Sequence, residues 1–198
     1  MELIIIRHGR PERIENAAGP ADPPLTEVGI KQAEAVAVWL LGEQIDSIYV
    51  SPMRRARETS EPLERLSGME ASVVAGIREF DDDADRYIPM EELKADKEAW
   101  RAWLAENRET RRDEFYAEVL AALAGIAADN RGKRVAVVCH GGVINTWAAD
   151  VLGMGPQMFF APDYTSVNRF MVASTGERSV ASLNDIGHLR QHPDLVLG

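Results

Sequence analysis

Two short apolar runs that lie far apart in the chain share one pattern. Residues 3–6 read Leu-Ile-Ile-Ile and residues 135–138 read Val-Ala-Val-Val, and both runs are unbroken and rich in β-branched side chains. Such runs are typical of strands that are buried on both faces of a parallel sheet. Each run leads into a histidine and then a glycine, at His8 and at His140. Because parallel strands present ligand-binding residues at their carboxyl ends, the pattern predicts two imidazoles side by side at one sheet edge.

The rest of the chain alternates helical and extended patterns. Thr26 and Ser51 are helix-start signals, the first followed by an acidic residue and the second by proline. Gly68 is predicted to close the second helix. In chain order the expected elements are a loop over 10–24, a helix from Thr26 to near Gly42, a strand over 45–50, a helix from Ser51 to Gly68, a short strand over 71–75, a helix over 115–128, a helix from Gly141-Gly142 to about Leu152, and a hairpin formed by 168–174 and 178–184.

This alternation predicts the α/β class, with helices on both faces of a central sheet in a three-layer α/β/α sandwich. A chain of 198 residues is long enough to bury one sizeable core, so we expect a single domain over 1–198. An insertion within it is expected over roughly 81–113, where Trp100 and Trp103 stand at helical spacing and are predicted to pack the insertion onto the body.

Composition narrows the function classes. A hydrophobic content of 45% and a charged content of 27% describe an ordinary globular protein, and no apolar run reaches membrane-spanning length. The formal net charge of −10 argues against nucleic acid as a partner, because nucleic-acid binding needs a basic surface. One cysteine excludes a disulfide framework, and the N-terminus shows no basic-then-apolar leader, so a cytoplasmic location is expected.

The residues at the end of the first strand suit phosphate chemistry. Arg7 offers a planar fork of donors for phosphate oxygens. The imidazole of His8 can act as a nucleophile, and Gly9 allows the backbone to approach a ligand closely. The alternative is that the strand simply ends in a polar turn. The second site of the same design, at Cys139-His140-Gly141-Gly142, favours the functional interpretation.

With these residues the chain resembles the histidine phosphatase superfamily, the phosphoglycerate mutase-like enzymes. Further matches are Leu25-Thr26-x-x-Gly29-x-x-Gln32-Ala33, Ser51-Pro52-x-x-Arg55-Ala56-x-x-Thr59, and Arg78-Glu79 after a short strand; they fall in the family's order over residues 3–144. The resemblance implies a mixed, mostly parallel sheet with one antiparallel strand. The ending from Leu183 to Leu189 resembles the phosphatase branch.

The resemblance also implies the roles of the site residues. Spacing alone does not choose between Arg54 and Arg55, but the family motif selects Arg55. The implied phosphate-binding groups are Arg7, Arg55, His140 and Gly141, and the implied nucleophile is His8. Glu79 stands where the family carries its acid. Cys139 is expected to point away from its neighbour His140 and to be a small core residue.

Arg10 marks a departure from the family. The family usually has Glu or Gln and then Thr or Ser after Arg-His-Gly, whereas this chain has Arg10 and Pro11. Arg10 is expected to be a substrate-binding cation at the rim of the pocket, and the alternative is a solvated surface arginine. The departure leaves the identity of the substrate open.

The resemblance implies a metal-independent phosphomonoesterase that forms a phosphohistidine on His8 and acts on a small phosphorylated substrate. No cofactor and no metal are expected, because the arginines supply the positive charge and the sequence shows no zinc or calcium spacing. Two alternatives stay open: a phosphoglycerate-type mutase, and a protein that binds phosphate or acts as a scaffold without catalysis. The sequence does not indicate an oligomeric state.

Overall fold

The computed structural model describes residues 1–89, 92, 95–98, 101 and 112–196. In this part of the chain, six strands form one sheet in the order β3-β2-β4-β1-β5-β6. Their bounds are Glu2–Arg7 for β1, Ser47–Val50 for β2, Ser72–Val73 for β3, Arg134–Cys139 for β4, Val167–Val172 for β5 and Arg178–Asp185 for β6.

The sheet is mixed. β1 pairs with β4 in parallel, β4 with β2 and β2 with β3 likewise, whereas β5 runs antiparallel to β1 and to β6. Thus β5 is the one strand of this sheet that runs against the others. The antiparallel pair of β5 and β6 is the hairpin that the sequence predicts.

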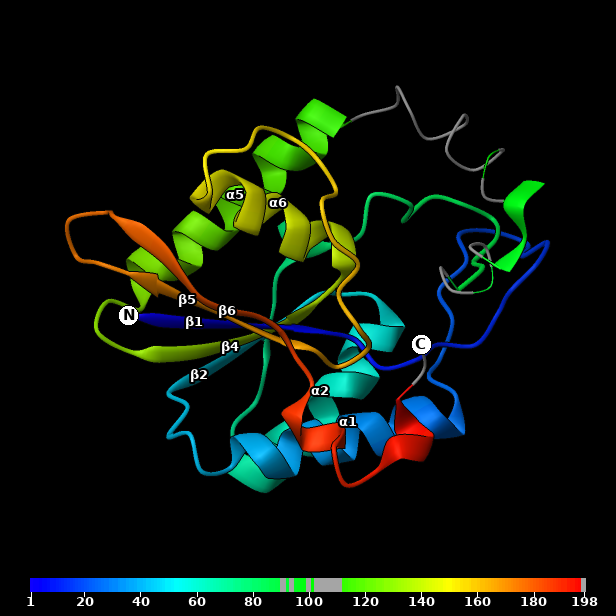
Figure 1. Ribbon diagram of the computed structural model, residues 1–198, viewed down its shortest axis with the longest axis horizontal. Helices are drawn as coiled ribbons and strands as arrows, with labels where there is room; N and C mark the ends of the chain where they lie inside the picture. Colours follow the sequence, from blue (N-terminus) through cyan, green and yellow to red (C-terminus); the bar gives the residue numbers. More distant parts are fainter. Residues whose placement is uncertain (90–91, 93–94, 99–100, 102–111, 197–198) are drawn as a thin grey trace.

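Helices cover both faces of the sheet, so the predicted three-layer arrangement is confirmed. α1 (Glu27–Leu40) and α2 (Arg54–Ser67) lie on one face, and α5 (Arg112–Asp129) and α6 (Gly141–Val151) lie on the other (Figure 1). Short 3₁₀ turns occur at Ala75–Ile77 (η1), Gly187–Leu189 (η2) and Pro193–Leu195 (η3). Among the described residues, no helix has both the length and the apolar character needed to cross a membrane.

The two core layers follow from the alternation of side chains along β1. Leu3 and Ile5 join the core beneath α5 and α6, which includes Trp147 and Phe170. Ile4 and Ile6 join the core beneath α1 and α2. Because both faces of β1 are buried, an uninterrupted apolar run is what this strand requires.

Helix boundaries test the predicted start and stop signals. Thr26 is the N-cap of α1, and its hydroxyl accepts a hydrogen bond from Gly29 N. Gly68 ends α2 in the left-handed conformation with φ 70°. The predicted start of α2 at Ser51 is wrong, because the helix begins at Arg54 with Met53 as its N-cap. The hydroxyl of Ser51 contacts His140 instead.

The predicted loop over 10–24 is held by the segment that follows Glu79. Ile14 and Tyr87 form an isolated antiparallel bridge, and Ala21 N donates a hydrogen bond to Ala84 O. Residues 92, 95, 97–98 and 101 are helical. Much of the predicted insertion over 81–113, including Trp100 and Trp103, lies outside the described residues, so its helical packing stays a prediction.

Candidate active site

The two histidines lie together because β1 and β4 are neighbouring parallel strands in register. Arg7 pairs with Cys139, so the next residue of each strand is a histidine. His8 N donates to Cys139 O at 2.9 Å, and the two imidazole centroids are 5.2 Å apart. His8 is 2% exposed and His140 is fully buried. The predicted juxtaposition is therefore found at the carboxyl edge of the sheet.

The backbone around Gly9 fixes the orientation of His8. Nδ1 of His8 lies 2.7 Å from Gly9 O, and because a carbonyl can only accept, Nδ1 carries the proton. Gly9 N in turn donates to Thr59 Oγ1 at 2.9 Å. A Cβ at Gly9 would lie 2.6 Å from Gly29 O, so a side chain here would disrupt the turn. The Nε2 atom of His8 consequently keeps its lone pair for a reaction.

His8 is held in the neutral state. Burial lowers the pKa of its imidazole well below the usual value, and the charges of Arg55 and Arg7 lower it further. The hydrogen bond to Gly9 opposes this shift. A neutral imidazole with a free Nε2 is the form that can attack an electrophile.

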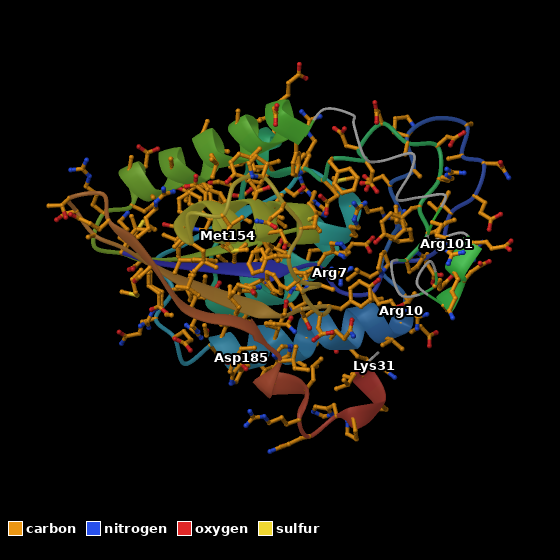
Figure 2. The ribbon with its side chains drawn as sticks, turned by 45° about the horizontal axis from the view of Figure 1, so that its top comes forward. Arg7, Arg10, Lys31, Arg101, Met154 and Asp185 are labelled. Atoms are coloured by element: carbon orange, nitrogen blue, oxygen red, sulfur yellow. The ribbon has the colours of Figure 1, made fainter. Side chains whose placement is uncertain are left out.

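Arg7 extends from the end of β1 into the same site. Its guanidinium lies over the ring of Tyr164, with the carbon 4.0 Å from the ring centroid, and Nη1 donates to Pro162 O at 2.6 Å. Within the described residues, its buried Nε has no hydrogen-bond partner. Figure 2 shows Arg7 at the end of β1, and Arg10 beyond it on the side of the molecule that carries Arg101.

Arg55 is the more deeply buried cation. Its side chain is only 1% exposed, and its guanidinium lies over the ring of Tyr87 at 4.7 Å. Two carboxylates stand near it, Asp81 at 3.7 Å and Asp22 at 4.0 Å. No hydrogen bond is made by Nε or Nη1 to any described residue. Buried donors of this kind are usually paired, so the guanidinium is arranged to receive an anionic ligand.

The neighbouring arginine behaves differently. Arg54 forms an ion pair with Glu58 at 2.7 Å on the outer side of α2, and its side chain is 57% exposed. The structure thus places Arg55 at the site and Arg54 at the surface.

His140 follows β4 and caps the start of α6. Its Nε2 lies 2.8 Å from Ser51 Oγ, and within the described chain its buried Nδ1 has no partner. Burial lowers the pKa of His140 well below the usual value, with further lowering from Arg55, His8 and Arg7. His140 is therefore neutral, like His8.

Glu79 reaches the site from the segment after η1. Its Oε2 accepts a hydrogen bond from Gly142 N at 3.0 Å, and its Oε1 accepts one from Phe80 N at 3.2 Å. Burial and the charge of Asp81 raise the pKa of Glu79 to about 7, although the two hydrogen bonds and Arg55 oppose the shift. A carboxyl with a pKa near neutrality can both give and take a proton under ordinary conditions.

Gly141 and Arg10 occupy different positions relative to this cluster. Gly141 is the first residue of α6 and lies beside Arg7, with room for a Cβ at 4.0 Å from Arg7 Nε. Arg10 lies at the margin, where Nη2 is 3.8 Å from a carboxylate oxygen of Glu92 and the side chain is 30% exposed. Arg10 therefore lies where the segment after Glu79 meets the loop over 10–24.

The sequence patterns did not single out three residues of the site. Tyr87 and Tyr164 hold the two arginines through their ring faces, and Asp81 stands opposite Arg55. The tyrosines had no sequence signal, because each lies in an irregular segment. Asp81 belongs to a run of three aspartates, and only the fold shows which of them turns inward.

Cys139 and His188 lie outside the site and have structural roles. Cys139 is fully buried in the core beneath α5 and α6, and burial raises the pKa of its thiol, which is an unreactive environment. His188 stacks on Trp39 at 5.3 Å and contacts Thr165 Oγ1, so its position is structural. Among the residues that the structure describes, no group of three or more His, Cys, Asp or Glu side chains is arranged to hold a metal ion.

The paired histidines, the buried Arg55 and the half-buried Arg7 thus lie together at the carboxyl edge of a mixed α/β sheet. The chain belongs to the histidine phosphatase superfamily (branch 1), whose family model matches residues 3–186. The resemblance seen in the sequence is therefore confirmed.

The similar proteins include both a probable mutase and phosphatases. The chain is 28% identical over 165 residues to a probable phosphoglycerate mutase GpmB of Photorhabdus laumondii, covering 78% of this chain and 76% of that protein. It is 28% identical to a phosphoserine phosphatase of Entamoeba histolytica whose structure was solved with 3-phosphoglyceric acid. That match has a TM-score of 0.75 and covers 95% of this chain and 98% of that one. A mycobacterial glucosyl-3-phosphoglycerate phosphatase, 22% identical with a TM-score of 0.74 over 92% of this chain and 98% of that chain, shares the fold.

Proposed function

We propose that this protein is a metal-independent phosphomonoesterase that works through a phosphohistidine on His8. The observation that carries the proposal is the state of His8. It is buried and neutral, its proton is fixed on Nδ1 by Gly9 O, and its free Nε2 lies among the cationic side chains of Arg7 and Arg55. A nucleophile prepared in this way, beside unpaired buried donors, suits attack on the phosphorus of a bound anion.

In the first half of the reaction, the lone pair of His8 Nε2 attacks phosphorus as the bond to the leaving oxygen breaks. Glu79 gives its proton to that oxygen, so the product leaves as an alcohol. Arg7, Arg55 and His140 bind the equatorial oxygens, where charge redistributes in the transition state. The backbone at Gly141 adds a contact at the start of α6. Preorganised donors of this kind each contribute about 100- to 1000-fold to the rate.

In the second half, Glu79 is ionised and takes a proton from a water molecule as that water attacks phosphorus. The bond between phosphorus and His8 Nε2 breaks, inorganic phosphate is released, and Glu79 regains its proton. One carboxyl therefore acts first as acid and then as base, which its pKa of about 7 allows.

The proposed substrate is a small phosphorylated metabolite. The E. histolytica relative was solved with 3-phosphoglyceric acid, and as a mutant with phosphoserine. Arg10 is proposed to contact the part of the substrate beyond the phosphate, because it lies at the margin of the site next to Glu92. Since the site draws on residues from Arg7 to Gly142, we propose one catalytic domain over 1–198. The fully buried Cys139 suits a reducing compartment, and we propose that the enzyme acts in the cytoplasm.

A phosphoglycerate-type mutase is the second candidate, and the names of the GpmB relatives favour it. A mutase must hold a carboxylate-bearing intermediate and return the phosphoryl group before water arrives. Asp81 and Asp22 stand within 4.0 Å of Arg55, and Asp82 and Asp83 follow Asp81 in the chain. This negative charge repels a second anionic group, which favours transfer to water.

The decisive experiment traps the intermediate. Neutral quenching with ³²P-labelled substrate is expected to leave acid-labile, alkali-stable label on His8. His8→Ala should lose both turnover and label, whereas His192→Ala, which changes an exposed histidine, should retain both. Label that survives acid or maps to Ser51 would contradict the mechanism. Loss of both signals in the wild-type protein with all phosphate esters would instead favour the non-catalytic, phosphate-binding alternative.

A paired assay separates phosphatase from mutase. Release of inorganic phosphate from 3-phosphoglycerate and formation of 2-phosphoglycerate are measured in the same sample. We expect phosphate release to be faster. Isomerisation that outpaces phosphate release would assign the chain to the mutases.

A further inference from the structure

Ser51 is a buried polar residue of the site that the mechanism above does not use. It follows the end of β2 and is fully buried. It does not cap α2, since that helix starts at Arg54. Its hydroxyl oxygen lies 2.8 Å from His140 Nε2 and accepts a longer hydrogen bond, 3.4 Å, from Met53 N. The structure thus places the hydroxyl of Ser51 against Nε2 of His140, which leaves Nδ1 as the ring nitrogen that could contact a ligand.

The proton of this hydroxyl has one acceptor among the residues that the structure describes. Met53 N is itself a donor, so it takes up acceptor capacity of Ser51 Oγ and cannot receive its proton. His140 Nε2 is the other neighbour at hydrogen-bond distance. A buried hydroxyl proton without an acceptor costs about 1–3 kcal/mol, so the O–H points at Nε2.

The protonation state of His140 independently indicates the same direction for the hydrogen bond between Ser51 and His140. The imidazole is neutral because burial, Arg55, His8 and Arg7 all lower its pKa, and a neutral imidazole has one N–H. If Nε2 accepts from Ser51, that N–H is at Nδ1. Nδ1 is buried, and the described chain offers it no partner. An N–H there is a donor for a phosphoryl oxygen, whereas a bare nitrogen lone pair would repel one.

We propose that Ser51 is a positioning residue that donates its hydroxyl proton to His140 Nε2 and thereby fixes the imidazole proton on Nδ1. The proposal rests on the proposed function, because it makes His140 a phosphate donor without a positive charge. It parallels the arrangement at His8, where Gly9 O imposes the same tautomer. The difference is that the partner of His8 is backbone, whereas the partner of His140 is a side chain that can be replaced.

The test reads the tautomer directly. Protein labelled with ¹⁵N at histidine is studied by two-bond ¹H–¹⁵N correlation spectra, with and without inorganic phosphate, and His140→Gln identifies the resonances. The wild-type protein should show the proton of His140 on Nδ1. In Ser51→Ala this pattern should change toward the Nε2-protonated form, while Ser51→Thr, which keeps a hydroxyl, should retain it.

Kinetics supply the second readout. For Ser51→Ala we expect kcat to fall about tenfold or more, yet less than the roughly 100- to 1000-fold loss expected for removing the donor itself in His140→Ala. Ser51→Thr should recover most of this loss. The matched control is Ser60→Ala, which removes a buried hydroxyl that lies within α2 and bonds inside that helix to Arg57 O. This control should keep the His140 tautomer and the rate.

Several outcomes would overturn the proposal. A wild-type His140 protonated on Nε2 would reverse the direction of the hydrogen bond. A slow Ser51→Ala variant with an unchanged tautomer would reduce Ser51 to a packing role, and an unchanged rate would remove its role altogether. If Ser51→Ala does not fold, the wild-type and Ser51→Thr spectra still decide. The tautomer is measured without turnover, so failure of the phosphatase assignment and failure of this inference are separate results.

Discussion

The backbone N–H of Gly142 donates a hydrogen bond of 3.0 Å to Oε2 of Glu79, and a Cβ at position 142 would collide with Oε1 of the same carboxylate. The absence of a side chain at Gly142 is therefore what leaves room for the proposed acid. The second glycine of the His-Gly-Gly sequence thus acts on a residue 63 positions away in the chain.

Gly142→Ala should displace the Glu79 carboxylate and lower kcat/KM for esters with poor leaving groups by about 100-fold, the lower end of the contribution of a general acid. Esters with good leaving groups should lose much less. Gly125→Ala is the control, since a Cβ there meets nothing within 4 Å and should stabilise α5 by about 0.5–1 kcal/mol. Equal losses on both ester classes would mean that Gly142 supports the fold and not the acid.

Deprotonation of Glu79 should cause the fall of kcat/KM on the alkaline side of the pH profile, which is its alkaline limb. Its pKa is raised to about 7 by burial and by Asp81, so the carboxyl is protonated below about pH 7 and ionised above it. Because the acid role needs the proton, kcat/KM for poor leaving groups should fall as pH rises through about 7. Glu79→Gln should be slow and lack this limb. A limb that persists in the variant would belong to another group.

Asp81 should determine in part the pH at which this alkaline limb occurs. Its negative charge raises the pKa of Glu79, second only to burial, so Asp81→Asn should lower this pKa and move the alkaline limb to lower pH. Asp82→Asn is the control of equal charge change, because Asp82 pairs with Arg78 at 3.1 Å and not with Arg55. A shift of the limb to higher pH in Asp81→Asn would contradict the role given to the charge of Asp81.

Thr59 should contribute to stability through one hydroxyl. Its Oγ1 accepts from Gly9 N at 2.9 Å and donates to Arg55 O at 2.6 Å, and the side chain is buried. Thr59→Val keeps the shape but leaves the Gly9 N–H unpaired, so urea unfolding should show a loss of about 1–3 kcal/mol. Thr59→Ser keeps the hydroxyl and should lose only about 0.8 kcal/mol for the missing methyl group. A Thr59→Val variant as stable as wild type would contradict this account.

Phosphatase activity should survive removal of metal ions. The proposed mechanism places positive charge on phosphate through Arg7 and Arg55, so dialysis against a chelator should leave kcat unchanged. Arg55→Ala should instead lower kcat/KM by 100-fold or more, as expected for a lost preorganised donor. Activity that is lost on treatment with the chelator and restored by zinc or magnesium would contradict the proposal that Arg7 and Arg55 supply the positive charge.

The two central strands and the histidines that follow them could be predicted because the signal is local. A buried parallel strand needs an unbroken apolar run, and residues 3–6 and 135–138 show it directly. The adjacency of β1 and β4 follows less directly, and the presence of one antiparallel strand in the sheet came from the family resemblance alone. Strand order depends on packing between distant segments, which periodicity does not encode.

The errors have a physical cause as well. Ser51-Pro52 has the local chemistry of a helix start, but the hydroxyl of Ser51 is engaged by His140, 89 residues later, and the helix begins further on. Among three consecutive aspartates, Asp81 faces Arg55 and Asp82 faces Arg78, and no local property separates them. The partner in each case is brought in by the fold.

The register of β1 against β4 also has a kinetic consequence. Each residue of β1 pairs with one that stands 132 positions later in the chain, so the two histidines meet only after a long loop has closed. Such non-local pairing is entropically costly and slow to form. An intermediate that has only its local helices and the β5–β6 hairpin therefore contains every proposed catalytic side chain but does not bring them together in one site. During refolding, the return of the proposed activity should therefore report the pairing of β1 with β4.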